Sequence, residues 1–493
     1  MITLAVVTAL LNAPIPFKLE RVAIVCPASL TANWTAEVEK WLPPSEVKFV
    51  VLTCRADMLC YTKNAPVVAI ASYDAWVSLR GVFEQNGQLC DLLVVDEAHR
   101  CVSVKSDIHQ SLLTIPTPSR LLLTGTPMRN DQLHHYYHLL DLACPGSFGT
   151  EVHFTRSFVA PIAAMGDGPE AEDFGRRTAL RLKRRAGFVL HKGDDFLEKF
   201  LPPLHEMLVL ASPSPMQVKC LEQLQQFSAL TMNDLEDGRA ILACPSLLAG
   251  PRWDTLKRAV DMPHCWTLET YKSHSGSLAV VCAIIQSTIE QSEDKLIISS
   301  YRLEELNLLA KVVRLMRIPG QSKQLAAGNE QRQKLIDSFN DVKDKSCRIL
   351  LLPGLSGGVG INLVGANRML MLGADWDPAN DLQLARRVWR PGQTSEVFLW
   401  RLVTKGCFDE RVFERGIDKE QLRLIIDSAG QKGKAADAAQ SAVQHDKISR
   451  LLYAPDLSPT WRELPPDHPA WSDLPSTSAS NAANKKLYFL SKT

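Results

Sequence analysis

Short apolar runs without strict alternation recur along this chain, and they constrain its fold more than any other feature. The first series, between residues 21 and 127, reads VAIVCP, VKFVVLT, PVVAIAS, LLVVDE and RLLLTGTP. Strands buried on both faces of a parallel sheet show continuous Val/Ile/Leu runs of this kind. The polar segments between the runs are long enough for crossover helices. We therefore expect a parallel α/β sheet in this part of the chain.

A second series with the same pattern reads KLIISSY, RILLLPG, RMLMLGA and VFLWRLV. Between the two series, amphipathic stretches predominate and strand candidates are few. The pattern predicts an α/β protein with two parallel-sheet lobes and a helical insertion between them. We place the first lobe at 1–150, the insertion at 151–290, the second lobe at 291–428, and a linker with a partly ordered tail at 429–493.

Composition limits the classes of function. Of the 493 residues, 46% are apolar and 22% are charged, as in ordinary globular proteins, and no apolar run is long enough to cross a membrane. The formal net charge is +1, so binding of nucleic acid must depend on local basic clusters. The 12 cysteines are scattered without any C-x-x-C pair, which argues against structural zinc and disulfides and favours a reducing compartment.

The segment LLVVDEAHR (92–100) carries the strongest chemical signal. An apolar strand brings Asp96 and Glu97 to its carboxyl end, where ligands of open α/β sheets bind. Asp96 there can hold Mg²⁺ through water, and Glu97 can orient and deprotonate an attacking water. A bare Asp-Glu pair would be read as solvated acids at a strand end. The full Asp-Glu-Ala-His string, ending at His99, is far more specific.

Two further blocks complete the pattern. In SRLLLTGTPMRN (119–130), a strand runs into a Gly/Thr/Pro turn, which brings Thr124 and Thr126 near the sheet edge that carries Asp96 and Glu97. In this order after the Asp-Glu-Ala-His string, the segment is typical of one that couples the state of the nucleotide to closure of the lobes. The block from 351 to 393 contains a glycine-rich run whose backbone can approach a ligand closely. It also contains Arg387 and Arg390, which are three apart, would share one helix face, and are typical of arginine fingers.

In their order, these blocks resemble the Swi/Snf family of superfamily-2 DNA translocases over nearly the whole chain. CPASLTANWTAEVEKWL is similar to motif Ia of that family and IASYDAW to motif Ib. DKLIISSY, the glycine-rich run and the two-arginine run are similar to motifs IV, V and VI. Within the family, the strings GINLVGANR, DWDPANDLQLARRVWRPGQ and RLVTKGCFDERVFER most resemble the Rad-fifty-four subgroup of recombination translocases.

The resemblance implies two RecA-like lobes, with ATP and Mg²⁺ as cofactors and double-stranded DNA as partner. It also implies that the protein acts in the nucleus, in DNA repair and homologous recombination. A RecA-like recombinase filament or chromatin would be a further partner. It implies catalytic roles for Asp96, Glu97, His99, Arg387 and Arg390, and nucleotide contacts for Asp96, Gly358, Gly360 and Gln393. It implies DNA contacts for Ser29, Asn33, Trp34, Ser72, Tyr73, Thr124, Thr126, Ser300, Tyr301 and Asn362. Trp34 and Trp376 are equally compatible with core aromatics. The run RRTALRLKRR (176–185) fits a solvated helix face or a contact with the DNA backbone.

This sequence also departs from the family pattern. It contains no G-x-x-x-x-G-K-[ST], and its only Gly-Lys, at 433–434, is followed by Ala. The opening MITLAVVTALLN resembles the helix that follows this phosphate-binding loop, so we expect a helix there, with the loop either upstream of Met1 or lost in a degenerate copy. A signal peptide would need basic residues before the apolar run, and there are none. Family-atypical residues also stand at Leu355-Ser356, His191-Lys192, Met128-Arg129-Asn130 and IPGQSKQLAAGNEQ, and each of these lowers the activity that we expect without changing the fold.

Three functions remain open at this point. The first is an ATP-dependent double-stranded DNA translocase, and the second is a catalytically inactive scaffold that binds DNA or a repair partner. An RNA helicase is disfavoured by the long insertion and by the VWRPGQ form of the last motif. The tail is rich in Pro and Ser, yet it carries Trp461, Trp471 and a terminal KLYFL, so we expect LYFL to dock on the second lobe.

Overall fold

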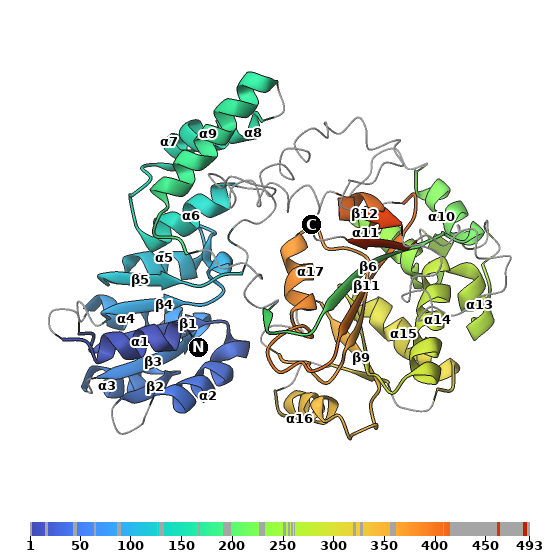
Figure 1. Ribbon diagram of the computed structural model, residues 1–493, viewed down its shortest axis with the longest axis horizontal. Coiled ribbons are helices and arrows are strands. Elements are labelled where there is room, and N and C mark those ends of the chain that lie inside the picture. Colours follow the sequence, from blue (N-terminus) through green and yellow to red (C-terminus); the bar gives the residue numbers. More distant parts are fainter. Residues whose placement is uncertain are drawn as a thin grey trace. The chain divides into compact units, whose positions relative to one another are not determined.

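The computed structural model describes residues 2–14, 18–42, 47–63, 66–85, 90–125, 127, 133–165, 168–190, 199–225, 232–249, 253–254, 257, 260, 262–318, 322–325, 329–354, 361–407, 409–414, 461–463 and 487–490. These residues form two units (Figure 1). The first unit holds the described residues of Met1–Leu190, and the second holds those of His191–Gln421 and His445–Thr493.

The first unit is built on a five-stranded sheet with the order β2-β3-β1-β4-β5, in which all neighbouring strands are parallel. Its strands are β1 (Arg21–Cys26), β2 (Lys48–Leu52), β3 (Val67–Ser72), β4 (Leu92–Val95) and β5 (Ser119–Leu122). The intervening segments contain α2 (Thr31–Trp41), α3 (Arg55–Lys63), α4 (Tyr73–Gln85) and α5 (Asp107–Thr114). All five strands lie in the apolar runs that predict them, and β1, β3 and β4 are almost entirely buried.

The N-terminal segment forms α1 (Ile2–Leu11), as its sequence predicts. One side of this helix is buried through Leu4, Val7 and Leu11. Ala5 and Val6 are exposed, so an apolar helix is only partly covered within the described structure.

The helices after β5 form a second layer of the first unit. They are α6 (Leu133–Ala143), α7 (Glu151–Phe154), the π-turn η3 (Thr155–Val159), α8 (Ala160–Ala163) and α9 (Pro169–Arg185). A core of their own, which includes Phe148, Phe154, Phe158 and Leu182, holds them together. Figure 1 shows α8 and α9 extending away from the sheet of this unit. The N-terminal part of the expected helical insertion is therefore helical and belongs to the first unit.

The second unit is built on an eight-stranded sheet with the order β12-β13-β6-β11-β10-β7-β9-β8. The strands β6 (Leu204–Ala211), β7 (Leu296–Ser300), β8 (Ser322–Gln324), β9 (Ile349–Pro353), β10 (Arg368–Leu372) and β11 (Val397–Thr404) are parallel. The helices of this unit are α10 (Pro215–Gln225), α11 (Met232–Ala243), α13 (Leu268–His274), α14 (Gly276–Gln291), α15 (Leu303–Leu315), α16 (Asn329–Asn340) and α17 (Pro378–Ala385). The two parallel sheets confirm the predicted α/β class.

Strand β6 lies inside the range that we expected to be a helical insertion. It pairs with β11 along its whole length, from Leu204 opposite Val397 to Ala211 opposite Thr404. Its first three residues are only partly buried and include His205 and Glu206, and its apolar run is confined to residues 207–211. The expectation of a helical insertion overlooked this short run, which pairs with a strand almost two hundred residues away along the chain.

The C-terminal strands complete this sheet. Strand β13 (Leu487–Leu490) pairs antiparallel with β6, with Leu487 opposite Val209, and β12 (Trp461–Glu463) pairs with β13. The expected docking of LYFL on the second lobe is thereby confirmed. Among the described residues, no helix is long and apolar enough to span a bilayer.

Candidate nucleotide site and its neighbours

Asp96 and Glu97 lie directly after β4, at the carboxyl edge of the first sheet. The backbone N–H of Asp96 donates to the carbonyl of Val25 at the end of β1 (2.8 Å), so the chain still follows the sheet at this residue. Glu97 then takes a left-handed conformation, with φ of 52°. This conformation costs energy for a residue with a Cβ and recurs at functional sites. The turn begins the short 3₁₀ segment η2 (Ala98–Cys101).

Two aromatic side chains from the neighbouring helices hold this turn. The indole N–H of Trp34, on α2, donates to Oδ2 of Asp96 (2.9 Å), and Oδ1 of Asp96 accepts from the backbone N–H of Glu97 (2.9 Å). The hydroxyl of Tyr73, at the start of α4, donates to the backbone carbonyl of Asp96 and lies 3.2 Å from that of Glu97. Motifs Ia and Ib therefore contact the carboxylate turn directly.

Burial raises the pKa of Asp96, and the hydrogen bonds from Trp34 and from the backbone of Glu97 oppose this shift. Each oxygen of this carboxylate accepts one described hydrogen bond, and each has a second lone pair. A metal-bound water can therefore still donate to Asp96. Within the described residues, no three His, Cys, Asp or Glu side chains converge on a metal position. Carboxylate oxygens such as those of Asp96 and Glu97 are ligands that suit Mg²⁺, together with waters and phosphate oxygens.

His99 links the Asp-Glu-Ala-His turn to the next strand. Its Nδ1 lies 3.0 Å from Oγ1 of Thr124, after β5, and 3.4 Å from Oε2 of Glu97. The imidazole is buried, and the backbone N–H of Ala98 donates to the carbonyl of Leu123 (2.9 Å). The two motifs that the sequence singled out in this unit are therefore joined by hydrogen bonds.

Several predicted DNA contacts lie on exposed or half-buried backbone near the sheet edges. Ser29 and Asn33, at the start of the α2 region, are exposed, and so is Asn362 in the second unit. The hydroxyl of Ser72 accepts from the backbone N–H of Ala75 (3.2 Å) and thereby caps α4. Thr126, Gly358 and Gly360 lie outside the described residues, as do most of the family-atypical positions.

The two arginines of the second unit follow α17 rather than lying on it. That helix ends at Ala385, and Arg387 and Arg390 belong to the turns that continue from it. The carbonyl of Arg387 accepts from the N–H of Leu363 (3.0 Å), and Nη1 of Arg390 donates to the carbonyl of Ile361 (3.2 Å). Both arginines are therefore tied to the segment that follows the glycine-rich run. Our expectation of a shared helix face was wrong in that detail, since the helix has already ended.

Gln393 holds the same region from the other end. Its side-chain amide donates to the carbonyls of Ala366 (2.8 Å), Val364 and Val388 (both 3.3 Å). Its Oε1 accepts from the N–H groups of Thr394 and Ser395. The side chain is buried. Gln393 thus fixes residues 386–393, which carry the two arginines and are called the arginine segment below. Its contact with a nucleotide stays a prediction.

The motif IV residues Ser300 and Tyr301 both point into their own unit. The hydroxyl of Ser300 donates to Oε2 of Glu305 (2.5 Å), and that of Tyr301 donates to Oδ1 of Asp381 on α17 (2.6 Å). Oδ2 of Asp381 also accepts from Nη1 of Arg401 on β11 (3.0 Å). Sequence reasoning missed Asp381 and Arg401, because nothing in their local patterns distinguishes them from surface charges.

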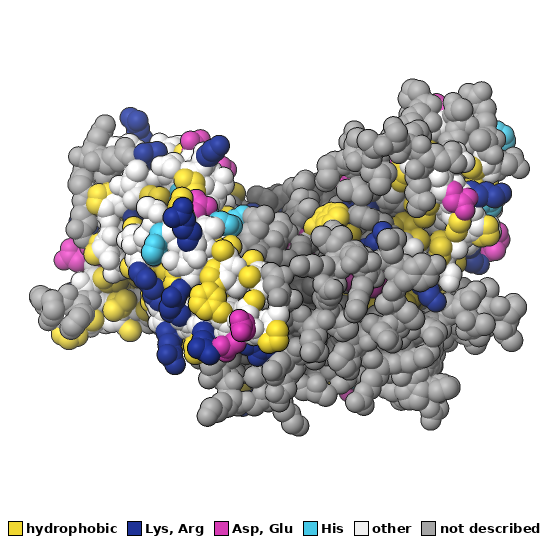
Figure 2. Space-filling model, turned by 90° about the horizontal axis from the view of Figure 1, so that it is seen from above, with side chains coloured by type: hydrophobic (Ala, Val, Ile, Leu, Met, Phe, Trp, Pro, Cys, Tyr) yellow, Lys and Arg dark blue, Asp and Glu magenta, His cyan; other side chains and the backbone are white. Residues whose placement is uncertain are grey.

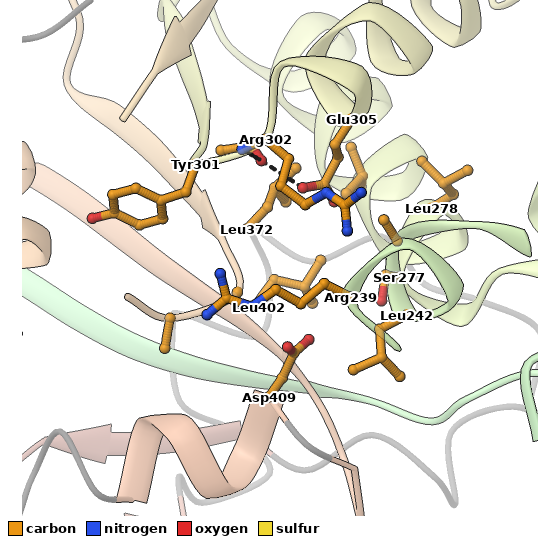
Figure 3. Close-up of a pocket in the computed structure, with 15 residues that line it drawn as sticks. Arg239, Leu242, Ser277, Leu278, Tyr301, Arg302, Glu305, Leu372, Leu402 and Asp409 are labelled. Carbon is orange, nitrogen blue, oxygen red and sulfur yellow. Dashed lines mark hydrogen bonds between the residues drawn. The ribbon is translucent and has the colours of Figure 1, made fainter. Parts of the chain in front are cut away.

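A cavity of about 560 Å³, including open solvent, lies at the carboxyl ends of β7, β10 and β11. Figure 3 shows Arg239, Arg302, Glu305 and Asp409 lining it from three different segments, since Arg302 and Glu305 both lie at the start of α15. Burial raises the pKa of Glu305 to about 7 and that of Asp409 to about 6, against the opposing effects of Ser300 and Thr404 and of the two arginines. These half-buried acids also carried no sequence signal.

Replacement of Glu305 by Gln is expected to stabilise the second unit at pH 8. A carboxyl group whose pKa is raised on folding keeps its proton while the unfolded chain has lost it, so stability falls as the pH rises from about 4.5 towards about 7. Glutamine avoids this loss and can still accept from Ser300. We expect the melting temperature of Glu305→Gln to rise by roughly 2–4 °C or more at pH 8 and to change little at pH 4.5. Thermal unfolding at both pH values, with exposed Glu304→Gln as control, would contradict this if the variant were less stable at pH 8.

The basic run 176–185 lies on α9. Arg176 pairs with Glu172 one turn earlier (2.8 Å), and the guanidinium groups of Arg181 and Arg185 stack on the rings of Phe158 and Phe148. Figure 2 shows Lys and Arg side chains scattered over the described face of the first unit, with hydrophobic and acidic side chains between them. Much of the positive charge of α9 therefore stabilises its own helical layer, which favours the interpretation as a helix face.

Comparison with known families agrees with these features. The SNF2-related domain family matches residues 1–252, and the helicase conserved C-terminal domain family matches residues 276–392. The first match contains the Asp-Glu-Ala-His turn with its neighbours, and the second contains Tyr301, Asp381 and the two arginines.

Curated relatives carry the same combination. The chain is 29% identical over 443 residues to the DNA repair and recombination protein RDH54 of Saccharomyces cerevisiae (strain YJM789), covering 83% of this chain and 46% of the relative. It is 29% identical over 463 residues to RAD54 of Oryza sativa subsp. japonica, covering 86% and 47%. It is 29% identical over 441 residues to RAD54B of Gallus gallus, covering 82% and 47%. The chain thus spans about half the length of the curated relatives that it matches.

Among solved structures, this chain is similar to the Sulfolobus solfataricus SWI2/SNF2 ATPase core in complex with dsDNA. The match covers 85% of this chain and 84% of the chain in that structure, with 19% identity and a TM-score of 0.34.

Proposed function

Because this chain belongs to the SNF2-related family, we propose that it is the motor core of an ATP-dependent double-stranded DNA translocase that acts in DNA repair and homologous recombination. The observation that carries the proposal is the carboxylate turn of the first unit. Asp96 and Glu97 follow a buried parallel strand, and residues of three other motifs contact the same turn. A scattered set of family-like residues would not make these contacts.

In this proposal, Asp96 holds Mg²⁺ through water and Glu97 acts as the general base. The metal supplies positive charge that stabilises the phosphates and their developing charge. Trp34 and the backbone of Glu97 orient the carboxylate of Asp96, while His99 connects Glu97 to Thr124. A shift in the position of Thr124 would thus alter the hydrogen bonding of His99 and, through it, the position of the Glu97 carboxylate, without any large rearrangement.

The residues that would hold the phosphates are incomplete in this sequence. The 493 residues contain no G-x-x-x-x-G-K-[ST], whose backbone N–H groups, Lys and Ser/Thr hold the phosphates and the metal. The acidic half of a Mg²⁺-ATP site therefore fits, and the phosphate cradle is not among these residues. We propose that Arg387 and Arg390 supply further positive charge to the transferring phosphoryl group, with Gly358 and Gly360 near the nucleotide.

Duplex DNA is the proposed partner because the relatives are named as DNA repair and recombination proteins. Exposed hydroxyl and amide groups, such as Ser29, Asn33 and Asn362, suit contacts with phosphates, which position a protein without reading bases. Such a protein would work in the nucleus, with a RecA-like recombinase filament or chromatin as a second partner.

A catalytically inactive scaffold is the second candidate, and one specific observation favours it. The 493 residues contain no phosphate loop, while residues that match the DNA-contacting motifs of the family are present. A scaffold and a motor core would both bind duplex DNA, and only the motor core would hydrolyse ATP once the cradle is supplied.

Binding of duplex DNA tests the shared part of the proposal. The chain should bind a 30-base-pair duplex without sequence preference, and its affinity should fall steeply with salt, because phosphate contacts release counterions. Asn33→Ala and Asn362→Ala should each weaken binding roughly 2- to 10-fold. Fluorescence anisotropy measures this, with Ser78→Ala, at an exposed position of α4, as control. Equal affinity for duplex RNA, or no binding at all, would contradict the proposal.

A further inference from the structure

We propose that Tyr301 is a positioning residue for Arg387 and Arg390, acting through Asp381, rather than a contact to DNA. The role of the two arginines in ATP hydrolysis rests on the proposed function. The contacts that connect Tyr301 to them do not depend on it.

The first step is the hydrogen bond between motif IV and α17. Tyr301 Oη donates to Oδ1 of Asp381 (2.6 Å), and Arg401 Nη1 donates to Oδ2 (3.0 Å). Only 4% of Asp381 is exposed, and its carboxylate accepts these two hydrogen bonds in addition to one from the backbone of Asp375. Burial raises the pKa of Asp381, and Arg401 and Tyr301 oppose that shift. A buried carboxylate that loses one of its donors is left with an uncompensated desolvation cost.

The second step is the packing of the Tyr301 ring. It lies against the hydrophobic cluster that contains Val388 and Trp389, two residues of the arginine segment. It also lies directly against Gly354, where an added Cβ would come within 2.6 Å of the ring. Gly354 lies three residues before Gly357, the first glycine of the glycine-rich run (357–360). Tyr301 thus contacts Gly354, and it packs against the cluster to which two residues of motif VI also belong.

The third step is the way in which the arginine segment is held. On its N-terminal side it continues from α17, which Asp381 anchors to Tyr301 and Arg401. On its C-terminal side, Arg390 and Gln393 bond to the backbone after the glycine-rich run. Loss of the Tyr301 hydroxyl would loosen the N-terminal anchor while the C-terminal one remains.

The orientation of Tyr301 also disfavours a role in DNA binding. Figure 3 shows its ring directed away from the cavity into which Arg302 and Glu305 point. Burial and the carboxylate of Asp381 raise the pKa of Tyr301 well above its ordinary value, so its hydroxyl remains a neutral donor. A hydroxyl that is engaged with a buried carboxylate cannot donate to a phosphate without breaking that bond.

Tyr301→Phe in the full chain tests this inference, because it removes the hydroxyl and keeps the ring. Hydrogen exchange followed by mass spectrometry should show that amides in 378–393 exchange roughly tenfold faster or more, since a hydrogen bond to an ionised acceptor is lost. Exchange in the first unit should not change. Asp381→Asn, which weakens the same connection, should affect the same peptides, and Tyr271→Phe, at another buried tyrosine of the second unit, should not.

A local spectroscopic signal separates positioning from general loosening. Trp389 lies between the two arginines, and its indole N–H donates to the carbonyl of Pro202 (2.8 Å). In chain labelled with 5-fluorotryptophan, Tyr301→Phe should shift or broaden the ¹⁹F resonance of Trp389, assigned with Trp389→Phe. The resonances of Trp34 and Trp76 should stay unchanged.

The affinity for a 30-base-pair duplex completes the test. We expect Tyr301→Phe to change it less than twofold. Tenfold weaker binding with unchanged exchange in 378–393 would make Tyr301 a DNA contact and overturn the inference. Unchanged exchange and an unchanged Trp389 resonance would overturn it as well. If the wild-type chain bound no DNA, the proposed function would fail, and the exchange and ¹⁹F results would still decide the role of Tyr301.

Discussion

Replacement of Arg390 with Ala is expected to lower ATP turnover by about 10³-fold or more, and replacement of Arg387 should have an effect of the same order. The measurement needs a phosphate-loop fusion, in which the strand and Gly-Lys-Thr loop of a family member precede Met1. Guanidinium groups that neutralise the transferring phosphoryl group act mainly in the transition state. Their loss should therefore lower kcat much more than it lowers the affinity for ATP.

The structure supplies a matched control for this experiment. Arg386 stands next to Arg387 in the same turn, so Arg386→Ala removes an equal charge at a neighbouring position. It should change turnover little if position rather than net charge matters. Affinity for duplex DNA should change less than twofold in the Arg387 and Arg390 variants. Collapse of DNA binding with surviving ATPase activity would instead identify the pair as a clamp on DNA phosphates.

The 493-residue chain without such a fusion is expected to release phosphate from ATP at a negligible rate. Asp96 alone would have to position the metal, and no phosphate loop would hold the β- and γ-phosphates of the nucleotide. Electrostatic stabilisation of the transferring group is usually the largest catalytic contribution, and much of it would be missing. Steady-state phosphate release with and without duplex DNA measures this. Robust release that Glu97→Gln abolishes would show that the cradle is dispensable here.

The parallel strands were predictable because burial on both faces leaves a continuous apolar run in the sequence. All described strands of the first unit and four of the six described parallel strands of the second lie in such runs. Strand β6 was missed because its polar first residues obscure the short apolar run 207–211, and β8 was missed because Ser322–Gln324 carries no apolar run. The end of α17 at Ala385 was likewise hidden, since the following turns keep a helix-like spacing of residues.

The candidate site was predictable where function demands a fixed string of residues. The Asp-Glu-Ala-His turn and its link to Thr124 follow from two short motifs at the ends of neighbouring strands. The contacts of Trp34 with Asp96 and of Tyr301 with Asp381 join residues 62 and 80 positions apart, and no local pattern encodes such pairings. Half-buried acids such as Glu305 and Asp409 look like surface acids in the sequence, and only the fold brings them together around one cavity.

We propose that this chain is the core of an ATP-driven motor that duplex DNA stimulates, and phosphate release by the phosphate-loop fusion tests this proposal most directly. The account predicts that double-stranded DNA stimulates release, that RNA does not, and that Glu97→Gln abolishes the stimulated rate. A rate of phosphate release that duplex DNA does not change, or that RNA raises equally, would contradict this proposal. A fusion that binds DNA and nucleotide yet releases no phosphate would identify this chain as a scaffold.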